Sequence, residues 1–362
     1  MLKRFFKFGL FITNIIVVIL FLIGAIAAYF SPEIFLLPAY LGIAFPYLTL
    51  LNLIFIVIWI IRWKRYVWLS VFAAFAGWGQ YQSIAQFNFA TAKTDGTPLK
   101  IITHNIRAFG LNGPRFEKET GRKIFNFYSN TQADIYCFQE FFNTKNFNFF
   151  PLDSMIAATQ LPYQHIEYSV HFRGNDFGLA TFSKYPIISK GVVPVAQQGT
   201  NMCIYTDVEI ENRIYRIYNF HLASIHFKES EYRYIEEIQN KNQEEHIKAA
   251  SNLFTLLGGA FERRALQVET IKKHMNSSPY PVIVCGDFND TPHSYAYHTI
   301  KKGMKDTFNQ KGFGLGNTYN GNLPPLRIDF VMVPENFSTL KHLVIKENLS
   351  DHYPVLTHVL PT

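Results

Sequence analysis

Two long uncharged stretches near the amino terminus constrain the fold of this chain more than any other feature. No charged residue occurs from Phe8 to Phe30 or from Ile34 to Ile61, and both stretches are rich in Ile, Leu, Phe and Val. A helix of about 20 apolar residues crosses the roughly 30 Å hydrocarbon core of a bilayer. Pro38 and Pro46 are compatible with this, because membrane helices tolerate proline kinks. We therefore expect two antiparallel transmembrane helices, since a cleaved signal peptide would have a shorter apolar run.

Basic clusters flank these stretches and set the expected topology. They lie at 3–7 and 62–65, so the positive-inside rule places both in the cytoplasm. Tyr66 to Ala92 is also uncharged, and its portion from Val67 to Trp78 is apolar enough to begin a third span. We expect this third segment to cross, with a surface-lying helix or a linker as the alternative. A third crossing in the cell (inner) membrane places the rest of the chain in the periplasm or outside the cell.

The composition changes after the apolar region. Residues 1–92 form the expected membrane anchor, 93–98 a polar linker, and 99–362 a single domain of many short strand-like runs and few long helices. The formal charge of +7 suits an anionic partner. It is weak evidence, because basic residues beside the membrane segments contribute to it. Three cysteines give neither an even-numbered disulfide framework nor a CxxC metal pair.

One helix-prone segment, 228–274, interrupts the pattern of strands. It is densely charged before Lys248 and largely apolar from Ala249 to Phe261, around a Gly258-Gly259 pair. We expect a helical hairpin packed on the core. The alternative is an arm whose apolar tip, Leu253 to Phe261, leans on the bilayer or on a lipid substrate.

Polar side chains follow the apolar runs of the domain at the points where these runs end. The clearest case is PVIVCGDFNDTP at 281–292, where a run of β-formers ends at Gly286 and acidic and amide groups follow. Taken singly, such residues have ordinary interpretations as turns, helix caps or ion pairs. Together the residues at these positions are Asn105, Glu140, His221, Asp287, Asn289, Asp329, Asp351 and His352.

This set of side chains is what metal-assisted hydrolysis of a phosphate ester requires. A carboxylate at the end of a buried strand, such as Glu140, needs a partner or a metal. Hard oxygen ligands such as those of Glu140 and Asn105 suit Mg²⁺. A metal and two imidazoles would balance charge on the phosphoryl oxygens during in-line attack. Asp329 beside His352 would set the tautomer of that histidine and raise its basicity.

Six short motifs occur in a fixed order: HN at 104–105, QE at 139–140, NFHL at 219–222, GDFN at 286–289, RIDFV at 327–331 and SDHYP at 350–354. In this order they resemble the endonuclease/exonuclease/phosphatase superfamily, which includes DNase I, apurinic endonucleases, neutral sphingomyelinases and inositol polyphosphate 5-phosphatases. GDFN followed by SDH is the specific part of the resemblance. It implies an α/β fold, a four-layer α/β/β/α sandwich like that of DNase I, with the site at one edge of two packed sheets.

The resemblance also implies a role for each matching residue. Glu140 would be the main Mg²⁺ ligand, completed or supported by Asn105 and Asp351, with Mn²⁺ as an alternative ion. Asp287 would orient or deprotonate the attacking water, with Asn289 beside the phosphate. His221 and His352 would be the phosphate-contacting pair, and Asp329 would lie behind His352. These five residues would form the catalytic group. Asn175 corresponds to an asparagine that binds substrate phosphate. Which group acts as the base stays open.

The chain departs from the pattern at Arg107. Some nucleases of the superfamily have an acidic residue two positions after the first asparagine, where this chain has a cation. The substitution argues against a two-metal site, and contact with substrate phosphate is an alternative role for Arg107.

These features predict a membrane-anchored, Mg²⁺-dependent phosphodiesterase or phosphatase. A nucleic acid and a lipid headgroup stay open as substrates, because the sequence has no base-reading motif. A hypothesis of another class is a catalytically silent, membrane-tethered binding module. All of Glu140, Asp287, Asn289 and His352 are present, which favours the enzyme.

Overall fold

The structure, a computed structural model, describes residues 2–88, 96–110, 118–144, 151–196, 199–225, 243–321 and 324–361. The chain divides into two compact units. The helical unit comprises Met1–Ile84, Ala223–Ala265 and His293–His298, and the sheet unit comprises Ala85–Leu222, Leu266–Pro292 and Thr299–Thr362. Residues 93–95 of the linker expected at 93–98 lie outside the described residues.

The helical unit begins with two long helices, α1 (Leu2–Ala25) and α2 (Leu37–Arg62). Both are long and apolar enough to cross a membrane by length and composition, a test that buried core helices and signal sequences also pass. Their surfaces expose large apolar side chains, including Phe5, Phe8 and Ile61. Exposed apolar patches of this kind are typical of surfaces that contact a membrane, another protein or a ligand.

Buried polar side chains join the helices of this unit. Asn14 of α1 donates from Nδ2 to Oγ of Ser70 (2.8 Å) and accepts at Oδ1 from the Trp59 indole of α2 (2.8 Å). Asn52 of α2 donates to the backbone carbonyl of Ser70 (3.0 Å). Asn14, Asn52 and Ser70 are buried, so these bonds satisfy groups that would otherwise be costly in an apolar setting.

The third apolar segment forms two short helices, α3 (Val67–Ala76) and α4 (Trp78–Tyr81), with Gly77 between them. Neither has the length of about 20 residues that a single span needs. The segment nevertheless runs along α1. Near its start the Tyr66 ring lies 4.9 Å from that of Phe11, and at its end Gln80 donates to the Ala25 carbonyl (3.1 Å). The third crossing stays a prediction.

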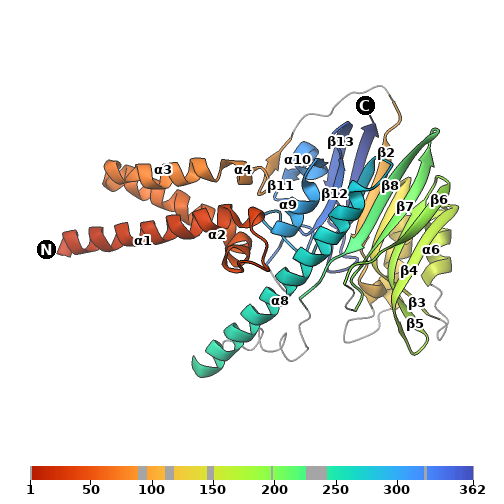
Figure 1. Cartoon of the computed structure of the whole chain (residues 1–362), viewed down its shortest axis with the longest axis horizontal. Coiled ribbons are helices and arrows are strands. Elements are labelled where there is room, and N and C mark those ends of the chain that lie inside the picture. Colours follow the sequence, from red (N-terminus) through yellow and green to blue (C-terminus); the bar gives the residue numbers. More distant parts are fainter. Residues whose placement is uncertain are drawn as a thin grey trace. The chain divides into compact units, whose positions relative to one another are not determined.

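The sheet unit contains two six-stranded sheets (Figure 1). The first has the order β10 (Met304–Asp306), β12 (Asp329–Pro334), β9 (Val282–Asp287), β8 (Arg213–His221), β7 (Met202–Ile210) and β6 (Ile187–Val193). The second has the order β13 (Phe337–Val344), β14 (Val355–Pro361), β2 (Leu99–Asn105), β3 (Ile135–Thr144), β5 (Asn175–Ser183) and β4 (Tyr163–Phe172). A further pair joins β1 (Gln86–Phe87) to β11 (Phe313–Gly314).

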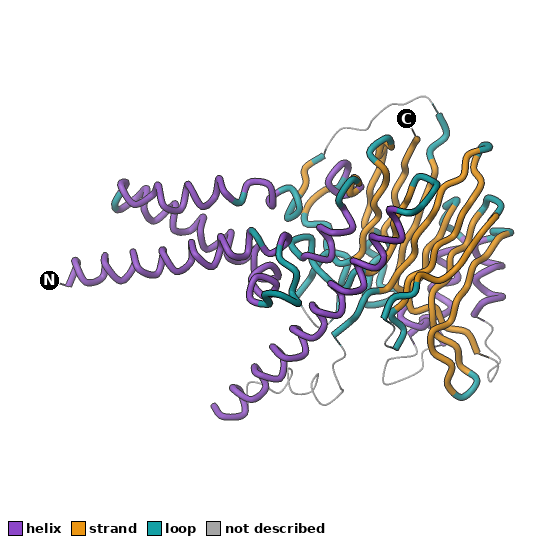
Figure 2. Tube along the Cα trace, viewed as in Figure 1, coloured by secondary structure: helices purple, strands orange, loops and turns teal. Residues whose placement is uncertain are grey.

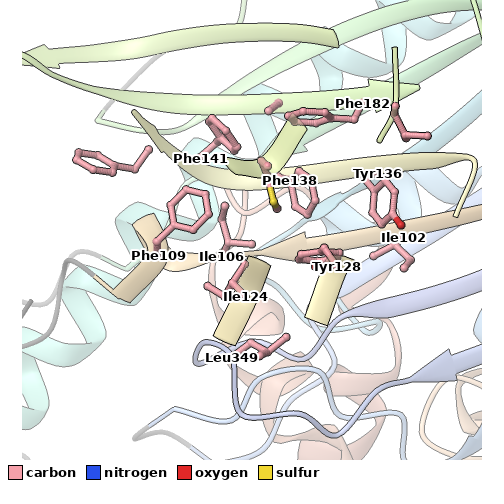
Figure 3. Packing of buried hydrophobic residues seen from close by; sticks show 14 of the residues in the cluster. Ile102, Ile106, Phe109, Ile124, Tyr128, Tyr136, Phe138, Phe141, Phe182 and Leu349 are labelled. Carbon is pink, nitrogen blue, oxygen red and sulfur yellow. The ribbon is translucent and has the colours of Figure 1, made fainter. Parts of the chain in front are cut away.

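The two sheets pack face to face, as the layered strands in Figure 2 show. Successive side chains of a strand point to opposite faces. Ile135 and Cys137 of β3 therefore enter the core between the sheets, with Ile283 and Val331 of the other sheet. Tyr136 and Phe138 of β3 point the other way, into a second cluster (Figure 3).

Helices cover the outer faces of both sheets. The second cluster is closed by α5 (Lys118–Ser129) and α6 (Pro151–Thr159), and the Tyr128 ring of α5 lies 5.0 Å from Phe138. On the other sheet, His274 of α8 (Gln243–Asn276) packs on Tyr205 and Tyr218. The α/β sandwich expected from the sequence is confirmed.

The described part of the segment 228–274 does not form the expected helical hairpin. From Gln243 onward the segment is one continuous helix, α8, and residues 226–242 lie outside the described residues. The glycine pair makes no turn. A Cβ at Gly258 would meet the Tyr40 hydroxyl at 2.7 Å, so glycine here allows close packing of α8 on Tyr40. The arm leaning on a bilayer stays a prediction.

We expect His342 of β13 to make stability depend on pH. Its Nδ1 pairs with Thr307 Oγ1 (2.8 Å), and burial lowers the pKa of His342 to about 4. In the unfolded chain the pKa of this histidine is near 6.5. As the pH falls from 7.5 to 5, His342 therefore binds a proton in the unfolded chain but not in the folded protein, and the free energy of unfolding decreases by about 2 kcal/mol. We expect the free energy of unfolding, measured with urea on the full chain in micelles, to decrease over this pH range by about 2 kcal/mol less in His342→Gln than in wild type. An equal decrease in the two proteins would show that His342 is not the source of the pH dependence.

Candidate active site

Strand register brings the predicted polar residues to one rim. In the parallel pair β8 and β9, His221 lies opposite Asp287, and in the antiparallel pair β9 and β12, Asp287 lies opposite Asp329. In the other sheet, the parallel pair β2 and β3 places Asn105 opposite Gln139, next to Glu140. A bond from Asn105 Nδ2 to Asp287 Oδ2 (3.0 Å) joins the two sheets at this rim.

Glu140 reaches the rim through an irregularity in its strand. The pairing of β3 with β5 shifts register between Phe138 and Phe141, and Glu140 has a left-handed φ of 49°. Such a bulge adds a residue and re-aims the side chains beside it. Gln139 consequently stays buried between the sheets, where it donates to Asn219 Oδ1 (2.7 Å), while the Glu140 carboxylate remains partly exposed at the rim.

Asp287 lies at the centre of the cluster and is 0% exposed. Its Oδ2 lies 3.6 Å from Nε2 of His221 and 3.8 Å from Nε2 of His352. Its Oδ1 accepts from the backbone amide of Asn289 (2.8 Å), a residue with a left-handed φ of 51°. The His221 Nε2 also lies 3.8 Å from Glu140 Oε1. Both imidazoles therefore present Nε2 to the same carboxylate.

His352 is held by Asp329. Its Nδ1 lies 2.9 and 3.2 Å from the two carboxylate oxygens, and both side chains are buried. Burial alone would lower the pKa of His352, but the carboxylates of Asp329 and Asp287 outweigh it and hold the pKa well above the usual value. The Tyr319 ring packs edge-on against the imidazole (5.4 Å). Asp329 thus fixes the orientation of the His352 imidazole and favours its protonated form.

Two carboxyl groups at the rim resist ionisation. Burial raises the pKa of Asp287, and Asp329 adds to the effect, while His352, His221 and Asn105 oppose it. Burial likewise raises the pKa of Asp351, whose Oδ2 lies 3.4 Å from NH1 of Arg107. Crowded carboxylates of this kind are what a divalent cation stabilises.

Two groups of rim residues could hold such a cation. Asp287, Asp329 and His352 offer ligand atoms within 4.8 Å of one another. Asp329, however, is already paired with Nδ1 of His352 at hydrogen-bond distance. Glu140 combines a hard oxygen donor with partial exposure, so we favour the Glu140 edge.

Asn105 is oriented differently from the expectation. Its Nδ2 donates to Glu140 and Asp287, and its Oδ1 accepts from the Arg107 amide (3.0 Å). In this orientation Asn105 is a donor to the carboxylates. Rotation of the carboxamide by half a turn would present its oxygen to a cation.

The other predicted residues divide between the rim and its surroundings. Arg107 reaches Asp351, and Asn289 donates from Nδ2 to the Leu222 carbonyl (3.1 Å). Asn175 pairs in register with Thr144 and accepts from its hydroxyl (2.8 Å). Thr144 is four positions beyond Glu140 in β3, about 13 Å along a strand. Asn175 is therefore not gathered with the central cluster.

Two supporting residues were missed by sequence reasoning. Asn219 is buried between the sheets and donates to the carbonyls of Phe138 and Ala180. The Ser350 hydroxyl donates to the Asn105 carbonyl (2.7 Å) and accepts from the His352 amide (2.9 Å). Both lie inside quoted motifs, NFHL and SDHYP, so their presence in those motifs was the available signal.

Comparison of the sequence with family models identifies its relatives. Residues 102–352 match the model described as the Endonuclease/Exonuclease/phosphatase family. The chain belongs to this family. It is accordingly a phosphoric ester hydrolase with the DNase I-like fold. Residues 3–84 match a separate model, a domain of unknown function (DUF8431). No curated protein matches the sequence.

Solved structures show the same fold at low sequence identity. A family protein from Bacteroides vulgatus matches with TM-score 0.52 and 17% identity, over 74% of this chain and 100% of that one. The catalytic domain of human nocturnin, solved with a bound sulfate anion, matches with TM-score 0.52 and 15% identity over 73% and 95%. A mannosyl-6-phosphatase from Bacteroides thetaiotaomicron matches with TM-score 0.50 and 18% identity over 72% and 99%.

Proposed function

We propose that this chain is a Mg²⁺-dependent phosphoesterase that hydrolyses phosphodiester or phosphomonoester bonds by in-line attack of water. The observation that carries the proposal is the convergence of two imidazole Nε2 atoms on the Asp287 carboxylate, with Glu140 beside them. Acids, bases and a cation-binding carboxylate thus lie within reach of one phosphate group.

Each rim residue has a chemical task in this proposal. Asp287 accepts a hydrogen bond from the attacking water and takes its proton, and its raised pKa brings it closer to neutral pH. Cationic His352, fixed by Asp329, donates from Nε2 to a phosphoryl oxygen, and His221 donates to a second one. The Asn289 amide keeps the Asp287 carboxylate in place.

The donor set at the rim fits a divalent cation. Glu140 would hold the ion, supported by Asp351 and by Asn105 after rotation of its carboxamide, and Mn²⁺ would fit the same oxygen donors. The bound ion would offset charge on the phosphoryl group and on the leaving oxygen. Arg107, paired with Asp351, adds a cation where a second metal would otherwise be needed.

We also propose that the helical unit anchors the enzyme in the cell membrane. The exposed apolar surfaces of α1 and α2 support two crossings. The third segment supports another, because it accompanies α1 from Phe11 to Ala25 and shares buried bonds with it. Three crossings place the sheet unit outside the cytoplasm.

A substrate panel tests this function. Purified full chain in micelles should hydrolyse at least one of p-nitrophenyl phosphate, bis(p-nitrophenyl) phosphate, a hexose 6-phosphate, plasmid DNA and phospholipid or sphingolipid vesicles. Hydrolysis should require Mg²⁺ and stop with EDTA. Preference for vesicles would indicate a lipid-headgroup enzyme, and preference for DNA a nuclease. Turnover that is indifferent to EDTA would contradict the metal-dependent mechanism.

A further inference from the structure

His104, the first residue of the HN motif, lies directly behind the rim. Successive side chains of β2 point to opposite faces, so Asn105 reaches the rim while His104 points toward α5 and is 0% exposed. The Nδ1 of His104 lies 2.7 Å from the Tyr128 hydroxyl of α5, and its Nε2 lies 3.1 Å from the backbone carbonyl oxygen of His352. The imidazole of His104 therefore joins α5 to the segment that carries His352.

The partners of this ring determine which of its nitrogens carries the proton. A carbonyl oxygen only accepts, so Nε2 of His104 is the donor to His352. Burial lowers the pKa of His104 to about 3, so the ring is neutral and has a single N–H proton. Nδ1 then accepts from the Tyr128 hydroxyl. His104 is thus the Nε2–H tautomer.

Ser350 lies near the same carbonyl but has only one proton for two acceptors. Its Oγ lies 2.7 Å from the Asn105 carbonyl oxygen and 2.9 Å from that of His352. A hydroxyl has a single proton to donate, so Ser350 bonds to only one of these carbonyls at a time. The imidazole of His104 supplies the second donor. Without it, one of these two bonds is lost, which is costly because Asn105 and His352 are buried.

Both carbonyls belong to residues whose side chains build the rim. Asn105 donates to Asp287, and His352 presents Nε2 to the same carboxylate. The His352 side chain is bonded to Asp329 in the first sheet, whereas its backbone is bonded through His104 to β2 in the second sheet. A displacement of the His352 backbone is therefore passed on to the Nε2 that faces the site.

We propose that His104 is a positioning residue whose Nε2–H group fixes the backbone of His352. Its bond leaves the Ser350 proton for the Asn105 carbonyl, so that two rim residues are held at once. The effect on turnover rests on the proposed phosphoesterase function, whereas the tautomer of His104 and the order of the His352 ring do not.

The tautomer is measured by NMR on the wild-type full chain in micelles. In a sample labelled with ¹⁵N-histidine, the ring signals of His104 are those that disappear in His104→Gln. At neutral pH they should show a protonated Nε2 and an unprotonated Nδ1. A proton on Nδ1 would overturn the proposal, because Nε2 would then have nothing to donate to the His352 carbonyl. This measurement decides the question even where a substituted protein folds poorly.

Two substitutions of His104 test the donor itself, with a soluble p-nitrophenyl ester as substrate. His104→Leu has a similar volume and cannot donate, so kcat should fall about 10- to 100-fold with little change in KM, because small displacements of a reacting group cost this much. His104→Gln has an amide that can donate to the same carbonyl, so it should restore most of the rate. The Nδ1 proton signal of His352 should move in His104→Leu and stay near its wild-type position in His104→Gln.

His342→Leu is the matched control for the loss of a buried imidazole. His342 also pairs with a hydroxyl, that of Thr307 (2.8 Å), but it lies in β13 at the edge of the second sheet. His342→Leu should keep the wild-type kcat.

A wild-type kcat in His104→Leu would overturn the proposal. An equal loss in His104→Gln would do the same, because the donor would then be unimportant, and so would an equal loss in His342→Leu. An inactive wild type would refute the proposed function alone, and the NMR signals of His104 and His352 would still decide whether His104 holds His352.

Discussion

Replacing Asp287 with Asn should reduce kcat by about 10²- to 10⁴-fold, the contribution of a general base. The side chain touches both Nε2 atoms at the rim and accepts from Asn105 and Asn289, so its carboxylate charge is the property that the substitution removes. The amide has nearly the same shape and cannot take the proton of the attacking water.

The same substitution should leave the melting temperature unchanged or higher. Asp287 is a fully buried carboxyl whose pKa is raised by burial and by Asp329, so its ionised form is destabilised in the folded protein. A substitution that removes a buried charge needed for catalysis is expected to lower activity and to raise stability. Asp153→Asn, at an exposed position in α6, is the matched control and should change neither property. A fully active Asp287→Asn protein would remove Asp287 from the mechanism.

Replacing Glu140 with Gln should weaken the binding of Mg²⁺ to the enzyme. The Mg²⁺ concentration for half-maximal turnover should rise at least about 100-fold, since even supporting groups around a metal are worth 10- to 100-fold in affinity. Glutamine keeps the side-chain length and the bond from Asn105 but loses the charge. Glu119→Gln, in an exposed i,i+4 pair with Lys123, is the control for a general effect of charge. An unchanged Mg²⁺ profile in Glu140→Gln would place the metal elsewhere.

Much of the site could be predicted because its residues lie at the ends of neighbouring strands. His221 and Asp287 are the last residues of the adjacent parallel strands β8 and β9, so a sequence pattern of apolar run followed by polar residue was enough to bring them together. Asn105 was found in the same way. The sandwich fold followed from the order of the motifs, and the family model covers the same range.

Other features depend on contacts that a local pattern does not contain. The register shift that aims Glu140 at the rim arises from pairing with β5, a distant strand. Asn219 is buried because two sheets meet around it, and its sequence neighbours resemble an ordinary strand. The segment 228–274 was expected to form a helical hairpin, whereas the structure has one helix from Gln243 onward, with Gly258 in close contact with Tyr40.

The most direct measurement is a crystal structure of the full chain grown with Mn²⁺, with anomalous scattering used to locate the ion. We expect one strong peak beside the Glu140 carboxylate, with the Asn105 carboxamide turned so that its oxygen faces the ion. A peak confined to Asp287, Asp329 and His352 would contradict the assignment of Glu140 as the metal ligand. No peak at the rim at all would contradict a metal-dependent site.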